Sequence, residues 1–197
     1  MTLQGKVGSI TYGLGRARGE GSWPAVMAAK LKAGQGELPA GLILSPSGDG
    51  LVPYEAVADE SIGTGDGSNK SFTAILAKAP LRPSSLSVGD GTETFIDDGL
   101  GRLAGDAGGT GTVAYATGAV SVTFNAAPAN AAAVAADYER EPKAVLDEPV
   151  DTTLSGSGLV VRMGPVNRAM LKVGAVAPAA PADALLDQLI DRGIIPV

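Results

Sequence analysis

Four carboxylates close together in the middle of the chain are the residues best placed to do chemistry: Asp90, Glu93, Asp97 and Asp98. A pair of carboxylates facing each other across a pocket can act as general acid and general base, which would suit cleavage of a glycan. Carboxylate oxygens can also hold a calcium ion. However, the cluster lacks the regular alternation of a calcium loop, and nothing in the sequence sets two of the carboxylates across a pocket. We therefore favour an acidic turn over either site.

The residue types that the chain lacks exclude most other catalytic classes. None of its 197 residues is a cysteine or a histidine, so disulfides, thiolate chemistry and the usual general base near neutral pH are absent. Serine triads and zinc hydrolases of the common kinds are excluded with them. Glycine runs at 63–67 and 105–111 lack the spacing and the strand-to-helix context of a phosphate-binding loop. We expect a protein that is not an enzyme and that binds no cofactor and no metal.

Composition indicates a fold made of short strands. Hydrophobic residues make up 45% of the chain, enough for a core, but only 4% of residues are aromatic. The 28 glycines and 13 prolines favour tight turns over long helices. No apolar run approaches the roughly 20 residues of a membrane span, and residues 1–5 do not resemble the start of a signal peptide. We expect synthesis in the cytoplasm and no membrane contact.

The charge is unevenly distributed, with a basic leading segment and an acidic remainder. Residues 1–36 hold five basic residues and one acidic residue, a net charge of +4, whereas residues 37–197 carry −10. Apolar residues in this segment are spread among glycines, and three of them alternate as in a strand. Such a segment cannot bury enough surface to fold alone. We predict an extended arm over residues 1–36 that becomes ordered on an acidic partner.

Two distant regions are predicted to form one small β-rich base domain, residues 37–59 together with 140–197. The stretch 158–171 predicts a strand, a turn at Gly164-Pro165 and a second apolar segment, and its natural partners are strands near 42–44 and 51–54. A further strand is predicted at 144–146. Residues 183–193 predict a short helix that starts with an acidic residue and stops at Gly193.

The residues between these regions, 60–139, predict an inserted domain. They contain six or seven short strands at regular spacing, which is typical of a small antiparallel sandwich. The clearest signal is the alternation of 112–116 and 119–124 around Thr117-Gly118, which predicts a hairpin with a two-residue turn. The predicted fold class is therefore mainly β: a base domain with one short C-terminal α-helix, split by an inserted sandwich-like domain with a net charge of −5.

Several of these segments resemble phage head decoration proteins, the family typified by phage lambda. Residues 31–34, 41–44 and 50–54 resemble the start of that family. Residues 144–146, 159–168 and 192–195 resemble its C-terminal half, and the most specific part is the valine pair with Arg162 and residues 166–168. The inserted region is similar to a small β-module that recurs in phage structural proteins.

The resemblance implies a homotrimer on the outer surface of the virion head, over local threefold positions, where it stabilises the expanded shell. Its partners would be the major capsid protein and other copies of itself, with no nucleic acid and no membrane. The role of the inserted domain stays open between extra contacts with neighbours, weak binding of host surface glycans and simple coverage of the shell.

We assign two sets of residues on this basis. The capsid-binding arm comprises Val7, Ile10, Tyr12, Leu14, Arg16, Arg18 and Trp23. The base core and oligomer interface comprise Leu42, Leu44, Val52, Tyr54, Val160, Arg162, Val166, Asn167, Leu186, Leu189 and Ile190. An alternative interpretation is a tail, baseplate or fibre-associated adhesin that binds host glycans through the middle module. A glycan-cleaving enzyme that uses the four central carboxylates is a third.

Overall fold

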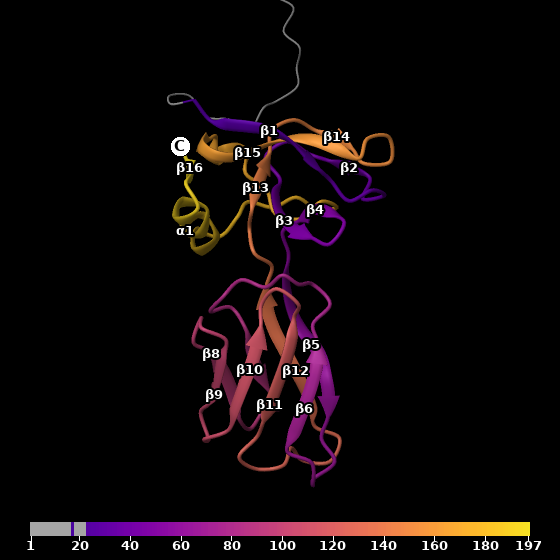
Figure 1. The fold of residues 1–197 in the computed structure, drawn as a ribbon, viewed down its shortest axis with the longest axis vertical. Helices are drawn as coiled ribbons and strands as arrows, with labels where there is room; N and C mark the ends of the chain where they lie inside the picture. The colour runs from indigo at the N-terminus through magenta and orange to yellow at the C-terminus, as the bar shows by residue number, and fades with distance from the viewer. Residues whose placement is uncertain (1–16, 18–22) are drawn as a thin grey trace, which may run out of the picture.

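The structure is a computed structural model that describes Ala17 and residues 23–197. It is mainly β, as predicted, and it consists of two β-sheet bodies placed end to end along the long axis of the molecule (Figure 1). The upper body in Figure 1, which we call the base, contains both ends of the described chain, and the lower body, the inserted domain, is formed by the residues between. Among the described residues, no helix has the length and apolar character needed to cross a membrane.

The base is built on a sheet whose strands come from both ends of the chain. Their order is β1-β15-β13-β3-β4, and neighbouring strands on this path are antiparallel. The strands are β1 (Ala25–Lys30), β3 (Ile43–Ser47), β4 (Gly50–Pro53), β13 (Ala144–Leu146) and β15 (Ser157–Val166). A sixth strand, β16 (Ile194–Pro196), runs parallel to the end of β15, and β2 (Glu37–Leu38) pairs with β14 (Val150–Asp151) beside the sheet. The predicted partnership between the two halves of the base is therefore made through β13.

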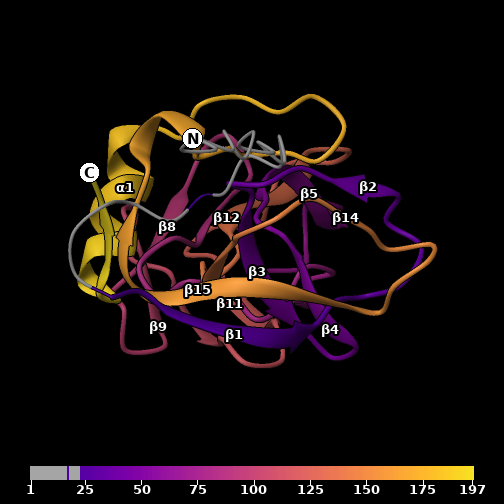
Figure 2. The same ribbon diagram turned by 90° about the horizontal axis from the view of Figure 1, so that it is seen from above.

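The base sheet curls until its two outer strands meet. Leu31, just after β1, forms a parallel bridge with Leu51 of β4, and the amide of Lys32 donates to the carbonyl of Leu51 at 3.0 Å. Seen from above, β1, β15, β3 and β4 enclose the base core, with the helix to one side (Figure 2). This arrangement corrects the predicted arm of residues 1–36, because residues 25–31 are part of the base.

The predicted turn at Gly164-Pro165 is wrong, since β15 continues through both residues. Gly164 has a φ of +100°, a conformation that favours glycine, and an added Cβ would lie 2.8 Å from the Cα of Pro24. Its amide donates to the carbonyl of Gly193 at 2.7 Å, which joins β15 to β16. The strand ends instead at η1 (Arg168–Met170), a short 3-10 helix.

The predicted C-terminal helix is confirmed as α1 (Asp183–Asp191). Arg192 is its C-cap, and Gly193 follows with a φ of +77°, the left-handed conformation that commonly ends a helix. Leu185, Leu186 and Leu189 are buried against the base core. The helix thus covers one face of the base sheet.

The inserted domain is a single antiparallel sheet of eight strands that wraps around its own core. The order is β5-β12-β7-β8-β9-β10-β11-β6. The strands are β5 (Ala56–Thr64), β6 (Ser71–Ile75), β7 (Ser87–Gly89), β8 (Thr94–Asp97), β9 (Arg102–Gly105), β10 (Thr110–Ala114), β11 (Ala119–Thr123) and β12 (Ala133–Glu139). At its centre Phe124 makes edge-to-face contacts with Phe72 and Phe95, at centroid distances of 5.7 and 4.9 Å. The sheet has more strands than predicted, and because β5 starts at Ala56 it includes residues 56–59, which the prediction placed in the base.

The predicted hairpin exists, but its turn is longer than two residues. Ala114 pairs with Ala119, so the connection between β10 and β11 comprises residues 115–118. The amides of Thr117 and Gly118 both donate to the carbonyl of Ala114, at 3.1 and 2.8 Å. The local alternation therefore indicated the two strands correctly but not the geometry of their connection.

The two bodies are joined by two adjacent connections and by polar contacts. The amide of Arg140 donates to the carbonyl of Glu55 at 3.0 Å, which ties the outgoing and returning chains together. Glu139 accepts from Nε of Arg82 at 2.8 Å and from the side chain of Gln188, on α1, at 3.2 Å. Burial alone would raise the pKa of Glu139, but these hydrogen bonds outweigh it and lower the pKa. The junction is thus a set of specific contacts between the base and the inserted domain.

The aromatic core of the inserted domain can be tested by a pair of neighbouring substitutions. Phe95 is fully buried, whereas Ile96 on the other side of the strand is more than half exposed. We expect Phe95→Ala to lower the free energy of unfolding by about 3–5 kcal/mol, because it removes a ring and leaves a cavity. Ile96→Ala should cost under about 0.5 kcal/mol. Denaturant unfolding followed by circular dichroism measures both, and equal losses would contradict the assigned inward and outward faces.

Candidate attachment surface

Six of the seven residues assigned to the capsid-binding arm lie outside the described residues: Val7, Ile10, Tyr12, Leu14, Arg16 and Arg18. Their assignment stays a prediction. The described part of the leading segment is Ala17 and the residues from Trp23 onward, and both bear on how the segment meets the base.

Ala17 is fully buried in the base core. Its amide donates to the carbonyl of Asp147 at 3.1 Å, and its carbonyl accepts from the amide of Asn167 at 2.7 Å. Both backbone groups of Ala17 are therefore hydrogen-bonded to the base: the amide to Asp147, just after β13, and the carbonyl to Asn167, just after β15. The prediction that residues 1–36 form an arm is therefore wrong at Ala17 as well, because Ala17 is part of the base core.

Apolar side chains are exposed where the leading segment enters the base. Trp23 lies two residues before the start of β1 and is 98% exposed, so its indole makes almost no contact with the described chain. Met27 of β1 and Met163 of β15 are 45% and 60% exposed, and Leu159 of β15 is just over one third exposed. We call these four residues the attachment surface. Both strands lie at the end of the molecule opposite the inserted domain (Figure 1).

The strand β1 also has a partly open edge. It pairs with β15 on one side through Ala25–Lys30. On its other side, the only pairing among the described residues is the bridge from Leu31 to Leu51 at its C-terminal end. The first four residues of β1 are largely exposed. An open edge next to exposed apolar side chains is a surface to which another chain can add a strand.

Most residues assigned to the base core or oligomer interface are buried within the chain itself. The buried ones are Leu42, Leu44, Val52, Tyr54, Val160, Val166, Leu186 and Leu189. They form the core and are not available to a neighbouring subunit. Burial also raises the pKa of Tyr54, with a smaller contribution from the nearby Glu139 carboxylate.

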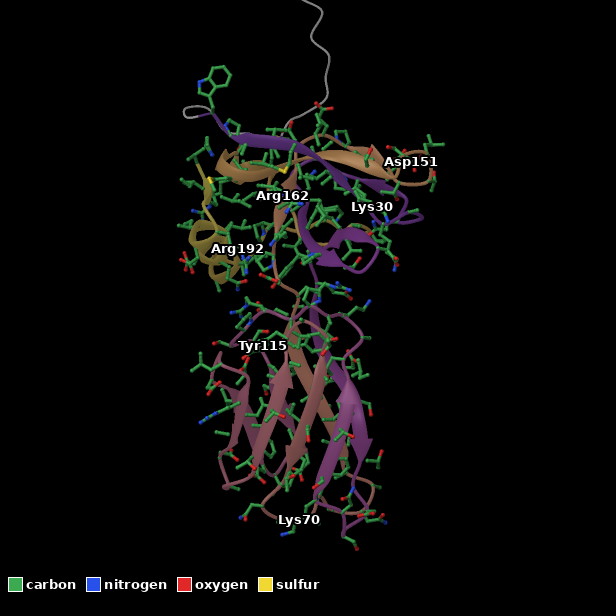
Figure 3. All side chains as sticks on the ribbon, viewed as in Figure 1. Lys30, Lys70, Tyr115, Asp151, Arg162 and Arg192 are labelled. Carbon is green, nitrogen blue, oxygen red and sulfur yellow. The ribbon has the colours of Figure 1, made fainter. Side chains whose placement is uncertain are left out.

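The other three residues of that set differ from one another. Asn167 is exposed and caps η1, its side-chain oxygen accepting from the amide of Ala169 at 3.0 Å. Arg162 is half-buried on β15, where it lies in the upper part of the base (Figure 3), and its Nε has no hydrogen-bond partner among the described residues. Ile190 is half exposed on α1. Of the three, only Ile190 offers an apolar side chain to a subunit contact.

The four central carboxylates accept hydrogen bonds from backbone amides, either of their own turn or of neighbouring loops. Glu93 is only 3% exposed, and its two oxygens accept from the amides of Gly109 at 2.6 Å and Asn125 at 2.8 Å. Asp90 and Asp98 each accept two amides from the turns that follow them. Among the described residues, no group of three acidic side chains is arranged to hold a metal ion. This geometry agrees with the acidic-turn interpretation.

Asp97 acts in the same way but also binds a side chain. It accepts from the amides of Ser84 and Gly99 and from the hydroxyl of Tyr115, the last at 2.6 Å. Burial raises the pKa of Tyr115 to about 12, and its hydrogen bond to Asp97 adds to the shift. Tyr115 lies at the end of the inserted domain next to the base (Figure 3). The pair thus fixes the connection between β10 and β11 beside the junction.

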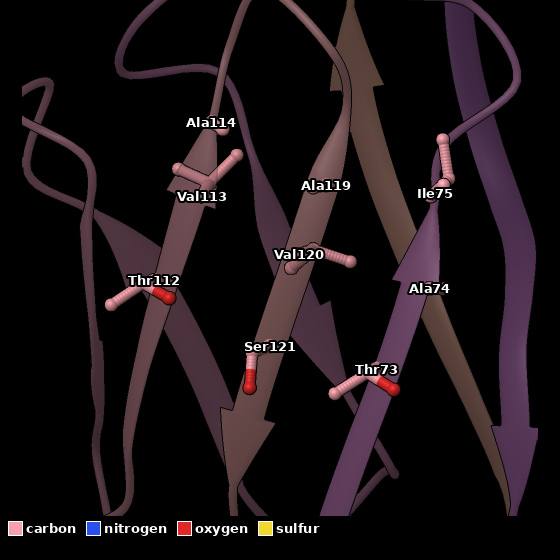
Figure 4. A pocket seen from close by; sticks show the side chains of 9 residues that line it. All are labelled: Thr73, Ala74, Ile75, Thr112, Val113, Ala114, Ala119, Val120 and Ser121. Atoms are coloured by element: carbon pink, nitrogen blue, oxygen red, sulfur yellow. The ribbon is translucent and has the colours of Figure 1, made fainter.

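The outer face of β6, β11 and β10 is a shallow pocket lined by short side chains (Figure 4). The three strands are in register, so that Ser121 lies opposite both Thr73 and Thr112. Ile75 stands at one margin and is 76% exposed. The face offers hydroxyl groups and small apolar groups but no aromatic ring against which a sugar could stack.

A comparison of the chain with protein-family models, with curated proteins and with solved structures found no match.

Sequence reasoning missed three of the four residues of the attachment surface, namely Met27, Leu159 and Met163. It identified their segments as strands or possible strands. Alternation could not have placed them on one outer face, because Leu159 and Met163 share a side of β15 with the buried Val161, whereas Met27 pairs with the buried Val160 on the other side. What it could not supply was the position of β1 at the edge of the base sheet. That position depends on pairing with residues more than 120 positions away.

The structural role of Glu93 can be tested against a metal-binding role. We expect Glu93→Gln to lower the free energy of unfolding by about 1–3 kcal/mol, because the amide turns one acceptor into a donor that faces a backbone N–H. Asp106→Asn is the control, since Asp106 is exposed and accepts a single amide. Thermal unfolding with and without calcium measures both. An unchanged stability of the Glu93 variant, with calcium stabilising only the unsubstituted protein, would contradict the structural role.

Proposed function

We propose that the chain is a capsid decoration protein, a homotrimer that binds the outer surface of a phage head and stabilises the expanded shell. The observation that carries the proposal is the polarity of the molecule. The exposed Trp23 and the open edge of β1 both lie on the base, and the inserted domain extends from its opposite end (Figure 1). A protein attached by the base would present the inserted domain outward.

The chemistry of the attachment surface suits a protein partner. Four exposed apolar side chains lie on β1, on its neighbour β15 and just before β1, on both sides of the sheet, and burial of apolar groups is a common core for a protein interface. The partner strand would supply backbone hydrogen bonds along the edge of β1. The basic leading segment adds a positive charge that favours an acidic capsid surface.

Trimer formation would make weak contacts sufficient. A trimer carries three attachment surfaces. Once the first has bound the shell, the effective concentration of the other two at their binding sites is raised. A ligand that binds only the expanded shell stabilises that shell by mass action, and no catalytic group is needed. We assign the subunit contacts to the exposed Ile190, Ile195 and Val197, on and beside α1 and β16.

A second candidate function is an adhesin that binds host glycans through the inserted domain. The shallow hydroxyl-lined face of β6, β10 and β11 is the observation that favours it (Figure 4). In that case the base would serve only to attach the chain to a tail or fibre. The absence of an exposed aromatic ring on this face makes it the weaker candidate.

The attachment surface can be tested with charge substitutions at exposed positions. We expect the double change Met27→Lys and Met163→Lys to weaken binding to expanded heads on the order of tenfold or more, because it puts charges where apolar groups must be buried. Ile75→Lys is the control, since Ile75 is an apolar residue even more exposed than the two methionines but lies on the inserted domain. Co-sedimentation of each variant with heads lacking the protein measures binding. Loss of binding in the Ile75 variant alone would favour attachment through the inserted domain.

The role of the leading segment in attachment can be tested by a deletion that leaves Ala17 in place. Removing residues 2–15 should leave a folded oligomer that no longer binds heads, whereas a deletion that also removes Ala17 should lower thermal stability because it opens the base core. Size-exclusion chromatography with light scattering checks the oligomer, and co-sedimentation checks binding. Normal decoration by the shorter deletion would contradict a role of the segment in attachment.

A further inference from the structure

A basic pocket lies at the junction between the base and the inserted domain, away from the attachment surface. It has a volume of about 620 Å³. Its walls are the loop after β1, the end of β4 with the connection to β5, residues 174–177, and Lys78 of the inserted domain. Lys32, Lys78 and Arg140 line it, and Glu55 is the only acidic residue among its lining residues. The pocket is therefore positively charged within a protein whose net charge is −6.

Arg140 is the buried one of these three cations. The residue is only 7% exposed, and its Nε is buried without a hydrogen-bond partner among the described residues. The one described hydrogen bond of its guanidinium runs from Nη1 to the carbonyl of Pro46, at 3.3 Å. Glu55 is paired instead with Lys78, at 3.3 Å. The carboxylate of Glu55 therefore acts on Arg140 without a close ion pair and is shared between two cations. A buried cation with incomplete charge compensation is costly, and a bound anion offsets that cost.

The pocket is held in shape by backbone contacts that do not depend on a ligand. The amide of Lys32 binds the carbonyl of Leu51, and the side chain of Gln35 reaches the carbonyl of Lys32 at 2.6 Å. On the other side of the pocket, the backbone at Lys78 is held in place, because its amide donates to the hydroxyl of Tyr138 at 3.1 Å. Burial lowers the pKa of Arg140, and the nearby carboxylate of Glu55 offsets this only in part. The site is thus preformed, and its charge is not balanced by the residues that line it.

We propose that this pocket binds a small oxyanion, a phosphate or carboxylate group held by Arg140, Lys32 and Lys78. Because Lys32 belongs to the base and Lys78 to the inserted domain, the bound anion would bridge the two bodies. Its binding would then stiffen the junction and fix the direction in which the inserted domain points. This site is independent of the attachment surface and does not rest on the proposed function.

The test uses the full chain, labelled with ¹⁵N, and two probes, inorganic phosphate and citrate, at an ionic strength kept constant with sodium chloride. We expect at least one probe to cause saturable shifts of the amide signals of Ala33, Gly34, Lys78 and Ala175. The better probe identifies the oxyanion as phosphate or carboxylate. The double variant Lys32→Met and Lys78→Met should bind about tenfold more weakly, because it removes two charge contacts.

Lys70→Met is the matched control, since Lys70 lies at the far tip of the inserted domain (Figure 3) and its loss changes the net charge without touching the pocket. It should bind as the unsubstituted protein does. Both lysines of the pocket are partly or fully exposed, so their variants are expected to fold. The proposal is overturned if neither probe gives saturable shifts, if the double variant binds unchanged, or if Lys70→Met weakens binding equally.

Discussion

The structure depends on the placement of β13 between β3 and β15. Val145 pairs with Ile43 on one side and with Val161 on the other, and all three side chains are fully buried in the same core. This pairing closes a long loop in the chain, and the entropy cost of loop closure grows only slowly with loop length. A whole domain can therefore be inserted between β4 and β13, provided that its two ends lie side by side. The hydrogen bond between Arg140 and Glu55 marks that point.

The same pairing gives the molecule its polarity. With both halves of the chain in one sheet, β1 and the C-terminal strand β16 both pair with β15 in the base, and the inserted domain lies at the other end (Figure 1). The exposed apolar side chains of β1 and β15 would be a liability on a free monomer, since open edges and apolar patches favour association. On the proposed account they are covered by the shell. The inserted domain instead buries Glu93 and Asp97 against backbone amides of its loops and shows hydroxyl groups on the outer face of β6, β10 and β11.

The sequence allowed the elements with a clear local pattern to be predicted, but not the features that depend on pairing between residues far apart in the chain. The alternation of β10 and β11, the valines of β15 and the apolar face of α1 are local patterns, and each of these elements was predicted. The path of β15 through Gly164-Pro165 was not, because a glycine followed by a proline usually marks a turn and only the pairing with β16 keeps the strand extended. The position of β1 in the base was missed for a similar reason. Its glycine-rich surroundings resemble an arm, and its partner β15 is more than 120 residues away.

The candidate site likewise contains residues that could be selected from the sequence and residues whose role depends on long-range contacts. Trp23 was assigned from the sequence to the capsid-binding arm, and in the structure it is almost fully exposed. The burial of Glu93 and the charge balance around Arg140 could not be predicted, since both arise where loops distant in sequence come together. Burial of a charged residue is a property of the assembled fold and not of its local sequence.

The central claim is that the base faces the shell and that the inserted domain points away from it. A cryo-electron microscopy map of heads carrying the protein, compared with heads lacking it, tests this directly. We expect threefold density over the outer surface, with β1 and β15 in contact with the capsid and the inserted domain furthest from it. Density confined to the tail, or the inserted domain in contact with the shell, would contradict the account.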